Sequence, residues 1–127
     1  MQNPDNLRVY AEARDLAAAI YQLTATFPPS ERYGLVAQMR RAATSVGSNV
    51  AEGCGRQGNR ALLAFLHQAL GSLDELEFQL EHSVRVAHCS SDAAAHPLDR
   101  ARRTRQMMIR LIAALRRRPD RTDEPEA

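Results

Sequence analysis

The sequence has no lysine and no tryptophan, and its other aromatic residues make up only 5% of the chain. A core with so few aromatic side chains must consist mainly of Leu, Val, Ile, Ala and Met, a composition that favours helices. The hydrophobic share of 44% and the charged share of 25% are ordinary for a globular protein. A chain of 127 residues is long enough to form one domain with its own core.

Cysteine is also scarce, and long apolar runs are missing. Cys54 and Cys89 lie far apart and form no CxxC pair, which favours two reduced thiols over a disulfide or a metal site. No run approaches the roughly 18 apolar residues of a membrane span. The first ten residues, MQNPDNLRVY, lack the apolar segment of a secretory signal. We therefore expect a cytoplasmic protein that does not associate with membranes.

Four amphipathic stretches are present, and no stretch resembles a strand convincingly. In each stretch, apolar residues recur every three or four positions, as they do on one face of a helix. Phe27-Pro28-Pro29 ends the first stretch, and Gly53, Gly55 and Gly58 end the second. Pro97 suits the first turn of the fourth. The expected helices cover approximately residues 7–26, 31–52, 60–88 and 97–117.

Short connections between four amphipathic helices predict an all-α domain, an antiparallel up-and-down four-helix bundle. The bundle is expected to span residues 1–119, because Pro119 ends the last helix. Residues 120–127 are expected to form a disordered acidic tail.

The segment 53–58 reads GCGRQG and so matches GxGxxG, a pattern found in dinucleotide-binding proteins. That pattern requires a strand before the glycines and a helix after them. Here a helix precedes the glycines, and no βαβ unit is present. The glycines are therefore interpreted as a helix end and an interhelical turn.

A polar stripe lies beside the apolar arc of the second helix. On the third helix, Gly71 and Ser72 are small enough for close approach, and Glu77 is expected near the centre of the apolar face. A buried carboxylate needs a partner, and Arg41 is the expected one. Glu52 and Glu75 could pair with Arg41, with Arg40 or with a second subunit. The residues expected to fix helix packing or subunit contacts are Arg41, Ser45, Asn49, Glu52, Gly53, Gly71, Ser72, Glu75 and Glu77.

The same glutamates could in principle act as acid–base groups or metal ligands. Metal sites in helical bundles typically use Glu-x-x-His, and none of these glutamates is followed by such a histidine. The four histidines show no ligand spacing, and no serine lies in a GxSxG context. We therefore expect neither enzymatic activity nor a cofactor or metal, with an enzyme using the glutamate cluster as the weaker alternative.

Positive charge is concentrated near the C-terminus. Residues 100–121 contain nine arginines and one acid, whereas residues 1–99 contain eight arginines and eleven acids. Within the fourth helix, few acids lie four positions from an arginine. Guanidinium groups match phosphate oxygens, so a polyanion, with RNA or DNA favoured, is the expected partner. Contact with the nucleic-acid backbone is expected through Arg102, Arg103, Arg105, Arg110, Arg116, Arg117 and Arg118.

The sequence from Phe27 to Arg56, together with FLHQALGSLDELEFQL, resembles the bacterial four-helix bundle protein family. This family includes the proteins encoded by intervening sequences in 23S rRNA genes. The sequence is also similar to the accessory variability determinants of diversity-generating retroelements. The matching positions are Phe27-Pro28, Glu31, Tyr33-Gly34-Leu35, Gln38, Arg41-Ala42, Ser45, Asn49, Ala51-Glu52-Gly53, Gly71-Ser72 and Glu75-Leu76.

The resemblance implies a homopentamer with a basic surface suited to RNA, and in the retroelement proteins a reverse transcriptase as a further partner. Gly47 departs from the family pattern, which often has proline there. The alternative function is a protein-binding scaffold whose arginines serve acidic partners or solubility.

Overall fold

The computed structural model describes residues 7–117, which form four α-helices and one 3₁₀ turn and contain no strand. Their bounds are α1 Arg8–Thr24, η2 Pro29–Glu31, α2 Leu35–Gly55, α3 Asn59–Arg85 and α4 Ser91–Arg117. Residues 120–127, predicted to be a disordered tail, lie outside the described residues.

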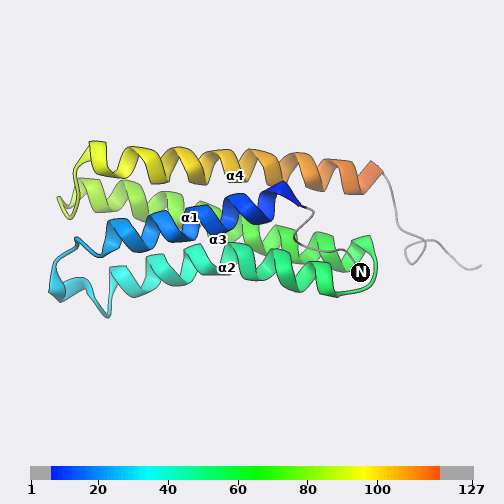
Figure 1. Cartoon of the computed structure of the whole chain (residues 1–127), viewed down its shortest axis with the longest axis horizontal. Coiled ribbons are helices and arrows are strands. Elements are labelled where there is room, and N and C mark those ends of the chain that lie inside the picture. The colour runs from blue at the N-terminus through cyan, green and yellow to red at the C-terminus, as the bar shows by residue number, and fades with distance from the viewer. Residues whose placement is uncertain (1–6, 118–127) are drawn as a thin grey trace, which may run out of the picture.

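The four helices lie side by side, and the loops between them alternate between the two ends of the group (Figure 1). Each helix packs against two others: α1 and α3 both contact α2 and α4. The arrangement is therefore a four-helix bundle. Of the described helices, none has the length and apolar character needed to cross a membrane.

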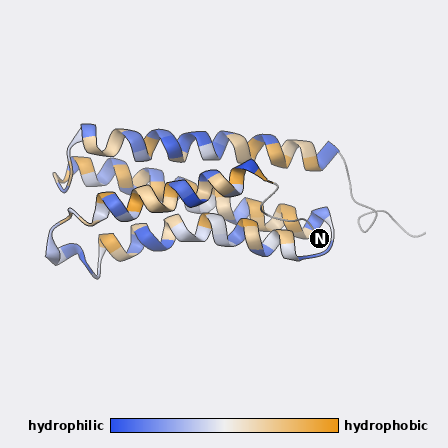
Figure 2. Ribbon diagram, in the orientation of Figure 1, coloured by the Kyte–Doolittle hydropathy of each residue, from blue (hydrophilic) through white to orange (hydrophobic). Residues whose placement is uncertain are grey.

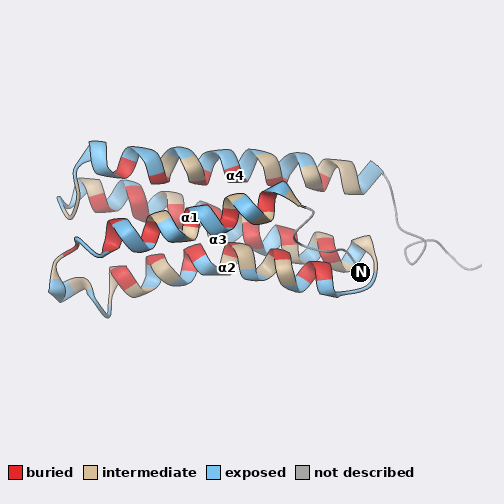
Figure 3. Cartoon of the chain, in the orientation of Figure 1, coloured by how far each residue is buried: buried red, intermediate tan, exposed pale blue. Residues whose placement is uncertain are grey.

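The core is aliphatic, as the shortage of aromatics predicts. Each helix carries an apolar stripe toward the others and polar residues on its outer face (Figure 2), and burial follows the same division (Figure 3). Fully buried large side chains come from all four helices, so burial of apolar area stabilises the whole bundle. Leu16, Ile20, Met39, Leu66, Leu73, Leu76, Leu80 and Met108 are the largest of them.

The start of α2 differs from the prediction by four residues. The segment Pro29–Glu31 forms a 3₁₀ turn, and Gly34 adopts a non-helical conformation directly before the helix. The Glu31 carboxylate accepts a hydrogen bond from the backbone N–H of Leu35 (3.3 Å), which satisfies one donor of the first turn. Two prolines and a glycine thus delay a helix whose apolar pattern begins earlier.

The end of α3 also differs, at Arg85 instead of residue 88. Ala87 has a positive φ of 63°, and the His88 N–H donates to the Ser83 carbonyl (2.9 Å). This left-handed turn closes the helix in the manner of a Schellman motif. The His88 ring then lies against Phe27, with ring centroids 5.7 Å apart, so the α3–α4 and α1–α2 connections meet at one end of the bundle.

The largest difference concerns α4, which begins at Ser91 and not at residue 97. The Ser90 hydroxyl accepts a hydrogen bond from the Ala93 N–H (3.0 Å), and Asp92 adds a negative charge in the first turn. Both features stabilise a helix start. Pro97 therefore lies inside the helix, buried against the bundle.

Candidate nucleic-acid interface

The arginines of the first half of α4 are paired with acids, most of which lie on the neighbouring helices. Arg102 contacts Glu81 (3.2 Å) and Glu77 (3.5 Å), and Arg105 Nε lies 2.9 Å from an Asp74 carboxylate oxygen. Arg103 has a weaker contact with Asp99, one turn earlier (3.7 Å). The charge of this half of the helix is thus largely balanced by carboxylates of α3, which an acid count along α4 alone does not reveal.

The second half of α4 is different. Residues 106–117 contain three arginines and no acid. Arg110 and Arg117 are exposed and form no ion pair within residues 7–117. Arg116 lies 2.9 Å from the Nε2 atom of His67 and forms no ion pair with a carboxylate within residues 7–117. Arg118 lies outside the described residues. Uncompensated positive charge on α4 is therefore concentrated toward its C-terminal end.

The polar stripe of α2 meets α3 through small side chains. The Ser45 hydroxyl donates a hydrogen bond to the Ser72 hydroxyl and so joins the two helices. The Asn49 amide donates back to the Ser45 carbonyl (2.8 Å) and stays within its own helix. Of the predicted polar network, Ser45 and Ser72 are the pair that a hydrogen bond joins across two helices.

The remaining carboxylates find partners other than those expected. Glu52 pairs with Arg56 on the surface (2.7 Å), and Glu75 accepts a hydrogen bond from the Gln79 amide (3.1 Å). Glu77 is half-buried between α3 and α4, and its partner is Arg102, so the prediction that it pairs with Arg41 is wrong. The reason is that Glu77 faces α4, whereas Arg41 lies on α2.

Arg40, the other arginine considered as a partner for Glu52 or Glu75, packs against α1. Its Nε donates to the Thr24 hydroxyl (3.0 Å), and its guanidinium lies 4.5 Å from the centre of the Tyr21 ring. It therefore contributes to the α1–α2 contact and not to the polar stripe.

The open part of the polar stripe forms a hollow on the α2–α3 face. Gln38, Arg41, Ser45 and Glu75 line this hollow of about 320 Å³, which we call the polar seam. Arg41 is exposed and forms no ion pair with any residue in the described part of the chain. Next to the seam, the Gln79 carbonyl oxygen is buried without a hydrogen-bond partner among residues 7–117. An unpaired buried acceptor is costly, so this face has unsatisfied hydrogen-bonding capacity.

Two glycines near the polar seam have different surroundings. Gly53 lies within α2, buried, and a Cβ there would meet the Phe65 Cβ at 2.9 Å and Leu62 Cδ1 at 3.0 Å. It is therefore needed for close approach of α2 and α3, and not as the helix end that the sequence predicts. Gly71 is exposed in the middle of α3, and nothing lies within 4 Å of a Cβ placed there.

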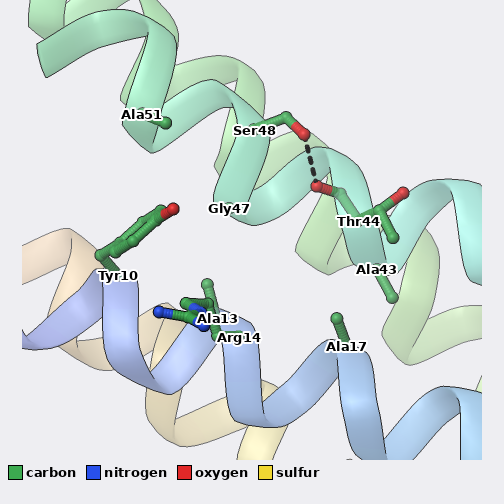
Figure 4. Close-up of a pocket in the computed structure, with 9 residues that line it drawn as sticks. All are labelled: Tyr10, Ala13, Arg14, Ala17, Ala43, Thr44, Gly47, Ser48 and Ala51. Carbon is green, nitrogen blue, oxygen red and sulfur yellow. Dashed lines mark hydrogen bonds between the residues drawn. The ribbon is translucent and has the colours of Figure 1, made fainter. Parts of the chain in front are cut away.

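Another hollow lies between α1 and α2 (Figure 4) and has about 280 Å³ of space. Its walls are mostly backbone and methyl groups, from residues such as Ala13, Ala43 and Gly47. Its one charged residue, Arg14, lies over the Tyr10 ring at 5.9 Å. No carboxylate lines this hollow, and of its two hydroxyl side chains, Thr44 and Ser48, the Ser48 hydroxyl donates to the Thr44 carbonyl (2.9 Å).

Both cysteines are free thiols, with Cys54 buried and Cys89 partly buried. Burial raises the pKa of the Cys54 thiol, and the same cause raises the pKa of Cys89, so both thiols are protonated at neutral pH. No group of three or more His, Cys, Asp or Glu side chains within residues 7–117 could hold a metal ion.

Comparison with known proteins shows the family of the chain. Residues 5–110 match the family model of the 23S rRNA-intervening sequence protein. The chain belongs to this family. No curated protein matches the sequence.

The fold of this 23S rRNA-intervening sequence family member is shared with a solved structure. That structure is of a protein of unknown function from the S23 ribosomal protein family of Bacteroides thetaiotaomicron. The TM-score is 0.78 at 21% sequence identity, over 87% of this chain and 99% of the other. The family match ends at residue 110, so Arg116 and Arg117 lie beyond it.

Proposed function

We propose that this protein is a non-enzymatic, oligomeric helical bundle that binds the phosphate backbone of RNA. The observation that carries the proposal is the exposed, acid-free arginine surface of residues 106–117. Arginine keeps its charge at any physiological pH, and its planar guanidinium can donate two hydrogen bonds to one phosphate. Membership of a family named for 23S rRNA intervening sequences supports RNA as the polyanion.

The contacts divide the proposed binding residues into two groups. Arg110, Arg116 and Arg117 have no carboxylate partner within residues 7–117, and we expect them to contribute most of the phosphate contacts. Arg102 and Arg105 would have to share their hydrogen bonds with carboxylates of α3. Arg103 is intermediate, because Asp99 lies 3.7 Å away and the side chain is 70% exposed.

The experiment is fluorescence anisotropy of a labelled structured RNA between about 50 and 200 mM salt. Replacing Arg110, Arg116 and Arg117 together by Gln should lower the magnitude of the salt slope by about three, because each phosphate contact contributes about one. The matched control replaces Arg102, Arg103 and Arg105 by Gln and should lower the slope less. Absence of RNA binding by the wild type at the lowest salt would refute the proposal.

For the assembly, we propose an antiparallel bundle that forms a homopentamer through the polar seam. Loops at alternate ends of the helices support the antiparallel order (Figure 1). The unpaired Arg41, the unsatisfied Gln79 carbonyl and the open space at Gly71 all favour a partner surface on the α2–α3 face. A mid-helix glycine costs about 1 kcal/mol relative to alanine, so a packing reason for Gly71 is expected.

A protein-binding scaffold is the second candidate function. Phe78 is 68% exposed on α3, and the ring of His82 stacks on it, with centroids 5.8 Å apart. Exposed aromatic side chains of this kind are typical of protein contact sites. A reverse transcriptase as that protein partner stays a prediction, and Phe78→Ala should weaken such a complex while leaving RNA binding unchanged.

A further inference from the structure

Two adjoining hollows lie between the start of α1 and the second half of α4. One is polar, about 310 Å³, and the other is smaller and apolar, about 170 Å³. Arg8 and Met107 line both hollows, so the two lie next to each other. The polar hollow is lined by Arg8, Glu12, Arg103, Gln106, Met107 and Arg110, and the apolar one by Leu7, Arg8, Val9, Met107 and Leu111.

The polar hollow is lined by three arginines and by one carboxylate residue, Glu12, so its positive charge is not balanced. Arg8 and Arg110 form no ion pair with the rest of the described chain, and Arg103 has one weak partner, Asp99. The single carboxylate, Glu12, is already held by Arg100 at 2.9 Å. Three guanidinium groups around one space repel each other unless an anion lies between them.

The backbone at the start of α1 also favours an anion in the polar hollow. Arg8 is the first residue of α1, whose N-terminus has no side-chain cap and no acid in its first turn. The unpaired N–H groups and the dipole of a helix N-terminus both favour an anion. Gln106 adds an amide that can donate a hydrogen bond to a phosphate oxygen or to a ribose hydroxyl.

The apolar hollow decides which phosphate compound fits. Leu7, Met107 and Leu111 are partly buried and offer aliphatic surface directly beside the arginines. A base is a flat group of low polarity on its faces, and a site for it needs apolar walls next to a phosphate site. Inorganic phosphate would leave this surface exposed.

We propose that the two hollows together bind one nucleotide unit, with its phosphate held by Arg8, Arg103 and Arg110 and its base against Met107 and Leu111. The nucleotide unit can come from an RNA chain or from a free mononucleotide. In its RNA form the inference rests on the proposed function, whereas in its mononucleotide form it stands independently. Sequence patterns do not predict Arg8 as a site residue, because its place beside α4 is a tertiary contact.

The first experiment is an NMR titration of the unaltered protein with uridine 5′-monophosphate at constant ionic strength. Saturable shifts are expected in the side-chain Nε–H signals of Arg8 and Arg110 and in the methyl signals of Met107 and Leu111. The signal of Arg85, at the opposite end of the bundle, should stay unchanged (Figure 1). Inorganic phosphate, the probe without a base, should shift the arginine signals alone.

The second experiment is the RNA anisotropy assay with Arg8→Gln and the matched control Arg85→Gln. Arg8→Gln should reduce the salt slope by about one, and Arg85→Gln should leave it unchanged. RNA binding that is insensitive to Arg8→Gln would overturn the RNA form of the inference and leave the proposed function intact. Saturable nucleotide binding without RNA binding would sustain the site and refute the proposed function. Absence of saturable shifts with uridine 5′-monophosphate would refute the mononucleotide form.

Discussion

At the scale of single residues, two glycines of α2 have roles that the sequence alone does not distinguish. Gly47 and Gly53 both lie inside α2, and the cost of adding a methyl group depends on what lies opposite. At Gly47 the nearest atom is the Ala13 Cβ at 3.7 Å, an ordinary contact. At Gly53 the Phe65 Cβ lies at 2.9 Å, so the helices would have to separate.

Gly53→Ala should therefore destabilise the bundle by about 1–3 kcal/mol, the usual cost of overpacking. The matched variant Gly47→Ala should stabilise it by about 0.5–1 kcal/mol, since alanine favours the helix over glycine. Urea denaturation followed by circular dichroism measures both. Equal effects of the two substitutions would contradict the close α2–α3 contact.

The pairing of Glu77 could be predicted from the sequence only in part. The helical face of Glu77 follows from its spacing, and the need for a cationic partner follows from its partial burial. The identity of that partner depends on which helix packs against that face, and α2 and α4 both offer arginines. Periodicity therefore predicts that Glu77 is paired, and the fold supplies Arg102 as the partner.

At the scale of helices, the four elements and their apolar faces could be predicted because their stripes are long and regular. Their ends were harder to predict, since short-range signals compete there. Pro97 is typical of a first turn, yet Ser90 and Asp92 give a stronger start six residues earlier. An internal proline loses its own N–H bond and its ring crowds the carbonyl four residues earlier, yet the packing of a helix against a core can outweigh that cost.

The contribution of the Ser90 cap of α4 to the stability of the protein can be measured. Ser90→Ala removes the acceptor of the Ala93 N–H and should destabilise the protein by about 1 kcal/mol. Ser91→Ala, one residue further on and exposed, should change the stability by less than about 0.5 kcal/mol. Denaturation midpoints of the two variants test the difference. An effect of Ser91→Ala as large as that of Ser90→Ala would place the cap elsewhere.

At the scale of the whole molecule, a substitution on the α2–α3 face can test the proposed assembly. Gly71 is exposed and a Cβ placed there has no atom within 4 Å, so Gly71→Leu should not disturb the bundle itself. If the α2–α3 face is a subunit contact, the larger side chain should block association. Light scattering of the wild type should give five times the chain mass of 14.1 kDa, and the variant should give a smaller assembly.

The control for this test is Ala18→Leu, on the exposed face of α1, which should leave the mass of the assembly unchanged. A Gly71→Leu protein with the same mass as the wild type would rule out the α2–α3 face around Gly71 as the contact surface. A wild type that stays a single chain at high concentration would rule out the pentamer itself.

The two ends of the bundle differ in how firmly they are closed. At one end, the contact between the Phe27 and His88 rings and the His88–Glu31 contact of 3.9 Å join the two connecting loops. At the other end, α1 has 17 residues against 27 in α4, and α4 continues beyond it (Figure 1). Local opening should therefore begin where the acid-free arginines lie, and a bound polyanion would order that end as it binds.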